Sequence, residues 1–151
     1  MNKARLAAQS RSHLDQRFKE LGSVTLYITP VRGWIAAIRG ALGMSSAQLA
    51  KRLGIKQPSV VAMEKSEARG AIELATLRRV AEALDCQLIY ALVPNKPLEA
   101  MVRDRARIFS RRRLAPVEHS MMLEGQAVPA ANVDASLEDT VRDTNPRLFW
   151  D

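Results

Sequence analysis

The chain has 151 residues, of which 47% are hydrophobic and 5% aromatic, and its formal net charge is +7. This length favours one domain or one small domain with appendages, and the positive charge suits a polyanionic partner. The single cysteine, Cys86, excludes a disulfide within one chain and argues against a cysteine-based zinc site. No apolar run approaches the roughly 18 residues of a membrane span, so we expect a cytoplasmic protein with no membrane partner.

Residues 1–30 predict a basic helix followed by a connector. Apolar or small side chains recur at intervals of three and four over residues 3–21, which is the spacing of one helical face; they are Leu6, Ser10, Leu14, Phe18 and Leu21. Gly22 is a typical C-terminal stop. Pro30 ends the weakly alternating segment that follows.

Residues 31–96 predict a compact bundle of helices. A first helix carries its apolar stripe over 34–42, and a second begins after Ser45, a residue type that caps helix N-termini. Further apolar positions follow Pro58, and a helix of clear 3.6-residue period covers 74–84. The apolar, partly β-branched run CQLIYALV that comes next, from Cys86 to Val93, is most simply a strand.

Residues 45–66 have the features that let one short helix enter a DNA groove. Two helices joined by a tight turn must cross steeply, which demands a small residue at their contact and a turn-compatible residue between them. Ala50 supplies the contact, Gly54 the turn, and Ile55 and Val60 the apolar side chains of the elbow. This segment therefore predicts a helix-turn-helix.

The pattern resembles the Xre family of helix-turn-helix domains, the Cro and cI repressor type. The matching residues agree in register and are Gln48, Leu49, Ala50, Leu53, Gly54, Ile55, Gln57, Val60 and Glu64. Lys56 and Pro58 depart from the commonest residues of that family, which leaves the exact base contacts open. The predicted fold class is mainly α: an Xre-type helix-turn-helix bundle with one C-terminal strand, flanked by an N-terminal helix and C-terminal helices.

Helix geometry assigns expected roles to the residues of this motif. Gln57 lies at the exposed start of the second helix and can bond bidentately to adenine or to another base edge, while Ser59 and Ala62 share its outward side. Ser46 can offer its hydroxyl and backbone N–H to a phosphate. The candidate phosphate contacts are Lys51, Arg52, Lys56, Lys65 and Arg69. The alternative is a helical bundle with solvated lysines and no nucleic acid.

The resemblance also implies a homodimer on double-stranded operator DNA. Related antitoxin repressors pair strands across a two-fold axis after their last helix, and the strand predicted at 86–93 has that position. An exposed apolar strand edge needs such a partner. We therefore expect two copies of the chain to bind one operator.

Residues 97–128 predict two further helices, the first ending at Arg111–Arg113. In the second, several side chains fall within about 60° of Val117 when each residue turns the helix by about 100°; they are Ser120, Met121, Glu124 and Val128. An unpaired carboxylate in such a stripe is costly, and it suits a partner that supplies a guanidinium. The alternative is a solvent-facing Glu124 near a helix end.

Ser120, Glu124 and Gly125 fit (Ser/Thr)-x-x-x-Glu-(Gly/Asn), which resembles the inhibitory-helix motif of Fic-domain regulation. Fic enzymes transfer AMP from ATP to protein hydroxyls. The resemblance implies that Glu124 pairs with the Fic arginine that would hold the ATP γ-phosphate, and that Ser120 helps to hold the helix in place. The order of a basic N-terminal helix, an Xre-type domain, the segment PLEAMVRDRA at 97–106 and the segment MMLEGQA at 121–127 is also similar to the mobile mystery protein A family, usually paired with a Fic-domain protein B.

The leading hypothesis is a bacterial antitoxin that inhibits a Fic-domain toxin and represses its own operon, associating with the nucleoid when bound to DNA. The alternative is a plain dimeric Xre repressor with no Fic partner. No catalytic residue, cofactor or metal site is expected, because His13 and His119 lie on different predicted helices and no Gly-rich phosphate loop or nucleophile elbow is present.

The remaining features concern the C-terminal third of the chain. The arginines between 103 and 113 can contact DNA or an acidic partner, or can form a solvated helix face. Residues 129–151 are acidic and rich in Asp, Asn and Ser, so we expect a mobile or partner-binding tail. The Phe149–Trp150 pair can dock on a partner or on the same chain.

Overall fold

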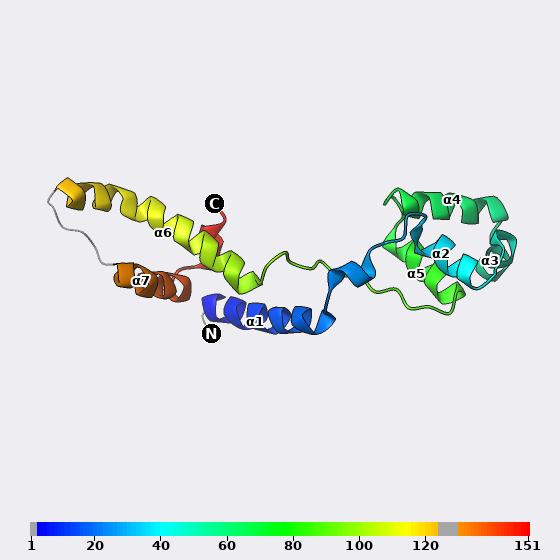
Figure 1. The fold of residues 1–151 in the computed structure, drawn as a ribbon, viewed down its shortest axis with the longest axis horizontal. Helices are drawn as coiled ribbons and strands as arrows, with labels where there is room; N and C mark the ends of the chain where they lie inside the picture. Colours follow the sequence, from blue (N-terminus) through cyan, green and yellow to red (C-terminus); the bar gives the residue numbers. More distant parts are fainter. Residues whose placement is uncertain (1–2, 124–129) are drawn as a thin grey trace. The chain divides into compact units, whose positions relative to one another are not determined.

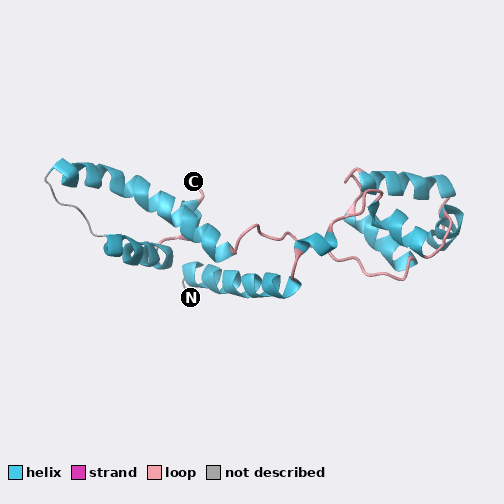
Figure 2. Ribbon diagram, in the orientation of Figure 1, coloured by secondary structure: helices cyan, strands magenta, loops and turns pink. Residues whose placement is uncertain are grey.

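The computed structural model describes residues 3–123 and 130–151, with side chains over 3–113 and 136–151. The helices are drawn in chain order in Figure 1, and Figure 2 shows helices and loops but no strand in the described residues. The chain divides into a central unit, residues 23–92, and a terminal unit, residues 1–22 together with 93–151. None of the described helices has the length and apolarity needed to cross a membrane.

The central unit is a bundle of α-helices preceded by a short 3-10 helix. Its elements are η1 Val24–Tyr27, α2 Gly33–Ala41, α3 Ser46–Leu53, α4 Gln57–Ala68 and α5 Leu74–Ala83. Their apolar faces bury a core of Ile35, Leu49, Ala50, Val60, Val80 and Leu84. The helical bundle predicted for this stretch is confirmed.

Short-range hydrogen bonds fix the two ends of α3. The Ser45 Oγ accepts from the Gln48 backbone N–H at 3.2 Å, and the Gln48 Oε1 accepts from the Ser45 N–H at 2.8 Å. This reciprocal cap satisfies two donors that a helix N-terminus otherwise leaves free. At the other end Gly54 has a φ of 67°, a left-handed conformation that glycine adopts without a Cβ penalty.

The strand predicted at 86–93 is wrong, because residues 86–94 have no regular secondary structure and no strand occurs in the described residues. A strand requires a neighbour that exchanges backbone hydrogen bonds with it, and in the described residues the backbone of this segment bonds only at its start, where the Cys86 N–H donates to the Ala81 carbonyl. Its apolar side chains remain exposed, with Ile89 at 66%, Tyr90 at 68% and Leu92 at 90%.

The terminal unit joins the two ends of the chain. It contains α1 Lys3–Leu21, which confirms the predicted N-terminal helix, together with α6 Leu98–Leu123, α7 Ala130–Asp143 and η2 Pro146–Phe149. Its core consists of Val102, Ala106, Leu137 and Phe149. The Phe109 and Phe149 rings meet edge to face, with their centroids 5.5 Å apart.

A carboxylate from α1 caps the N-terminus of α6. The Asp15 side chain accepts hydrogen bonds from the backbone N–H groups of Leu98, at 2.8 Å, and Glu99, at 3.2 Å. The positive end of the helix dipole favours an anion at this place. Beside it, the Arg11 Nε donates to the Glu99 Oε2 at 2.8 Å. These bonds join residues more than eighty positions apart.

The C-terminal third differs from its sequence-based expectation in two respects. One continuous helix, α6, runs through Pro116 where two helices were predicted; a proline there removes one backbone hydrogen bond but does not end the helix. Where a mobile or partner-binding tail was expected, α7 and η2 fold onto α6 and bury Leu137 and Phe149.

Candidate nucleic-acid interface

The turn between α3 and α4 presents the start of α4 to solvent. Gly54 turns the chain, and the Ile55 N–H donates to the Ala50 carbonyl at 3.0 Å, which holds the turn against the end of α3. Behind the turn, Leu49 and Val60 are 0% and 1% exposed. The packed elbow therefore fixes the direction of α4, while Gln57, its first residue, stays exposed.

Two of the predicted site residues are brought together across this turn. The Gln57 Nε2 donates to the Ser46 Oγ at 2.9 Å, although the residues are eleven positions apart. One amide N–H and the Oε1 atom of Gln57 remain available. These are one donor and one acceptor, which is the pair that the adenine N7 and N6 groups require.

The other predicted contacts of α4 are also exposed. Lys56 precedes the helix, and Ser59, Ala62 and Lys65 recur at three-residue intervals away from the buried Val60. The three remaining predicted phosphate contacts, Lys51, Arg52 and Arg69, are exposed as well, but the Arg52 Nη1 also donates to the Ala83 carbonyl at 3.1 Å, at the end of α5. Arg52 thus already has a structural partner.

A partly buried ion pair holds α4 against α2. The Arg39 Nε and Nη2 donate to the two carboxylate oxygens of Glu64 at 2.6 and 3.2 Å, and its Nη1 donates to the Met44 carbonyl at 2.8 Å. The side chains are only 17% and 12% exposed. The hydrogen bond to Glu64 raises the pKa of Arg39 despite the opposing effect of burial. The pair fixes the position of α4 within the bundle.

A second carboxylate of α4 was not anticipated from the sequence. Glu67 is 7% exposed and accepts the backbone N–H groups of Trp34 and Ile35 at 2.9 Å each, so it caps α2 from another helix. Gly33 makes room for it: its φ is 84°, and a Cβ there would lie 2.5 Å from the Glu67 Oε2. The only sign of this contact in the sequence is Gly33 at the start of an apolar helix.

The predicted Fic-inhibitory residues are at the edge of what the structure describes. Ser120 belongs to the helical backbone of α6, and its side chain lies outside the described residues, as do Glu124 and Gly125. Over the described part of the chain, no group of three or more His, Cys, Asp or Glu side chains is arranged to hold a metal ion.

Comparison with known proteins agrees with the geometry of α2 to α5. No curated protein and no solved structure matches the chain. Residues 35–90 match the family model described as helix-turn-helix. Residues 35–90 are therefore similar to helix-turn-helix domains, in agreement with the arrangement of α3, the turn and α4.

Proposed function

We propose that the chain is a transcriptional repressor that reads duplex DNA with α4 in the major groove. The observation that carries the proposal is the Gln57–Ser46 hydrogen bond, because it holds an exposed amide at the start of the helix with one donor and one acceptor free. Gln57 would contact adenine, and Ala62 a thymine methyl. Ser59 would lie at a neighbouring base edge, and Ser46, Lys56 and Lys65 would bind phosphates.

The repressor would act as a homodimer on an operator of two half-sites. Supporting this, the irregular segment after α5 leaves Ile89, Tyr90 and Leu92 exposed, and a second copy would remove that apolar surface from water. Sedimentation equilibrium of the full chain tests the dimer. A monomer at micromolar concentration would contradict it.

The test of base reading uses an operator selected from a random DNA pool by the full chain. Gln57→Ala should weaken binding to that duplex by about 1–3 kcal/mol, and should relax the preference at one base pair. Gln87→Ala, an exposed glutamine outside α3 and α4, is the matched control. Equal affinities for all three proteins would remove Gln57 from the base-reading residues.

We further propose that the chain is the antitoxin of a Fic-domain toxin in the bacterial cytoplasm. The support is the Ser120-x-x-x-Glu124-Gly125 motif of the sequence, whose first residue belongs to the helical backbone of α6. A carboxylate there can occupy the position of the ATP γ-phosphate on the Fic arginine, so that ATP cannot bind productively. The charge of one glutamate would thus replace the charge of one phosphate.

This second proposal is tested with the Fic protein encoded beside the gene. The wild-type chain should abolish AMP transfer by the Fic protein, and Glu124→Gln should restore it. Glu73→Gln, the control, should inhibit as the wild type does. If Glu124→Gln still inhibits, the inhibitory role is wrong. If no neighbouring Fic gene exists and operator binding is intact, the chain is a plain repressor.

A further inference from the structure

The exposed side of α6 carries an unusual density of arginine. Six of the eleven residues from 103 to 113 are arginines, and all six are exposed: Arg103, Arg105, Arg107, Arg111, Arg112 and Arg113. The stretch contains a single acidic residue, Asp104. Such a helix surface attracts polyanions unless its charges are neutralised within the fold.

Five of the six arginines lie along or beside the side of α6 that faces away from the core, whereas Arg113 lies over the Phe109 ring at 5.5 Å. Val102, Ala106 and Phe109 point toward α7 and η2. Arg103, Arg107 and Arg111 recur every four residues, and Arg105 and Arg112 are seven residues apart, so each set follows one line along the helix. The two lines border the outward side of α6.

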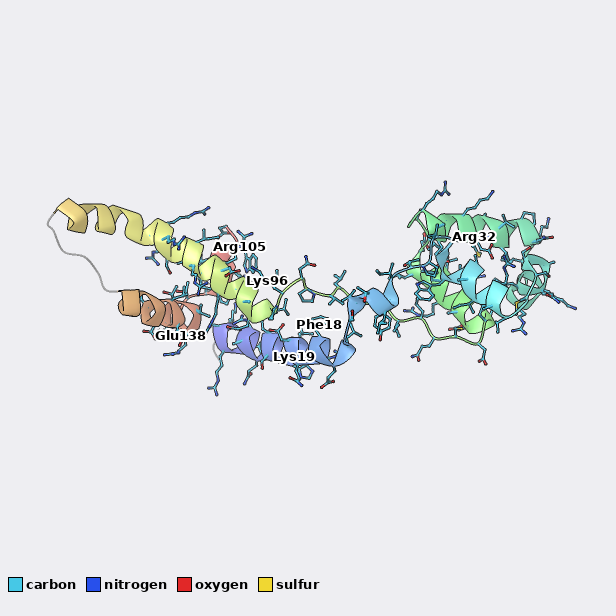
Figure 3. All side chains as sticks on the ribbon, in the orientation of Figure 1. Phe18, Lys19, Arg32, Lys96, Arg105 and Glu138 are labelled. Atoms are coloured by element: carbon cyan, nitrogen blue, oxygen red, sulfur yellow. The ribbon has the colours of Figure 1, made fainter. Side chains whose placement is uncertain are left out.

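Neutralisation within the fold is incomplete. Arg103 pairs with Glu138 at 2.8 Å and Arg107 with Asp104 at 3.6 Å, while Asp104 also pairs with Lys96. Arg111 and Arg112 have no ion pair among the described residues. Arg105 lies over the Trp150 ring at 5.3 Å, a contact that orients the guanidinium and leaves its charge in place. Figure 3 labels Arg105 on α6 and Glu138 on α7.

We propose that Arg105, Arg111 and Arg112 bind the phosphate backbone of DNA that flanks the operator. The inference rests on the proposed repressor function. The terminal unit is joined to the central unit by two peptide connections, after Gly22 and after Leu92. Binding of the central unit to an operator would therefore raise the local concentration of phosphates around α6. Guanidinium groups bind phosphate oxygens through paired N–H donors.

Phosphate is favoured over an acidic protein as the occupant. A protein interface has a desolvated centre rich in apolar and aromatic side chains. Between the two lines of arginine, Ile108 is the one large apolar side chain among the described residues, and it is 44% exposed. Charged groups spread along a helix without such a centre suit contacts that position DNA without reading its sequence.

The test measures how affinity for the selected operator, extended by flanking DNA on both sides, depends on salt. Each phosphate contact contributes about 0.9 to the slope of log K against log salt. The triple variant Arg105→Gln, Arg111→Gln, Arg112→Gln should therefore lower the magnitude of the slope by about 2 to 3 per bound chain. The matched control, Lys3→Gln, Arg17→Gln, Lys19→Gln, removes three exposed cations from α1 and should keep the wild-type slope.

The possible outcomes separate this inference from the repressor proposal. If the wild-type chain binds no duplex, the repressor proposal fails. If the wild type binds, Gln57→Ala weakens binding and the α6 variant keeps the wild-type slope, only the phosphate contact is wrong. Equal slope losses in both triple variants would indicate a general charge effect and would also overturn it. If the α6 variant keeps the wild-type salt slope on DNA but no longer binds the purified Fic protein, the arginines contact an acidic partner instead.

Discussion

The two units use their charged residues in different ways. In the central unit, the Arg39–Glu64 pair is mostly shielded from solvent, the Glu67 carboxylate is buried, and both join α4 to α2. In the terminal unit, the Arg11–Glu99 pair is 11% and 44% exposed, and the remaining pairs are more exposed still, such as Arg142–Asp139 at 70% and 64%. A buried pair restricts helix orientation, because breaking it leaves a desolvated charge, whereas an exposed pair costs little to break. The orientation of α4 is therefore held more firmly by charged contacts than the helices of the terminal unit are.

The largest effect is expected from breaking the Arg39–Glu64 ion pair. Arg39→Ala leaves the Glu64 carboxylate without its guanidinium and should lower the free energy of unfolding of the central unit by about 4 kcal/mol. Arg142→Ala removes an exposed partner and should cost less than about 1 kcal/mol. Hydrogen exchange of the full chain measures both, and equal protection of α2 to α5 in the two variants would contradict the contrast.

The next prediction concerns the core of the terminal unit. Phe149 is 4% exposed, so Phe149→Ala should destabilise α6 and α7 by about 3 kcal/mol through lost burial and a residual cavity. Leu148→Ala, a neighbour that is 46% exposed, is the control. Hydrogen exchange should rise in residues 98–112 and 136–149 and not in α2 to α5. A uniform rise across both units would show that they unfold together.

A smaller effect is expected at the glycine that admits Glu67. Gly33→Ala forces a Cβ into a left-handed backbone and against the carboxylate, and should cost about 2 kcal/mol. Gly43 has a similar φ of 65°, but no atom lies within 4 Å of an added Cβ. Gly43→Ala should therefore lower the free energy of unfolding only by the cost of the left-handed backbone conformation, about 1 kcal/mol. Urea unfolding compares the two. The Glu67 contact is unimportant if both variants lose the same amount.

The smallest effect is a pH dependence in the terminal unit. The hydrogen bond and charge of Lys96, and to a lesser degree the charge of Arg107, hold the pKa of Asp104 below its ordinary 3.8. Because the folded-state pKa is depressed, this contribution to stability is present above the ordinary pKa and is lost as the pH falls through the depressed value. The difference in melting temperature between wild type and Asp104→Asn should therefore shrink on acidification. In a Lys96→Met background the pH dependence of that difference should be much weaker.

The helices were predictable where their signals are local. Ser45 and Gln48 are three residues apart, and Gly54 acts through its own φ, so the ends of α3 could be read along the chain. The predicted strand at 86–93 failed because apolar β-branched composition reports burial tendency, while a strand needs a pairing neighbour. The predicted break near Arg111–Arg113 failed because Pro116 weakens a helix without having to end it.

The sequence by itself determined that the chain carries a helix-turn-helix, since the small contact residue, the turn glycine and the elbow side chains act within one short segment. Tertiary structure alone decided what holds that motif and what surrounds it. Glu67 reaches α2 across 32 residues and Asp15 reaches α6 across 83. Gln57 meets Ser46 only once the turn has formed. Such contacts depend on how packed helices meet in space, which no periodicity along the chain encodes.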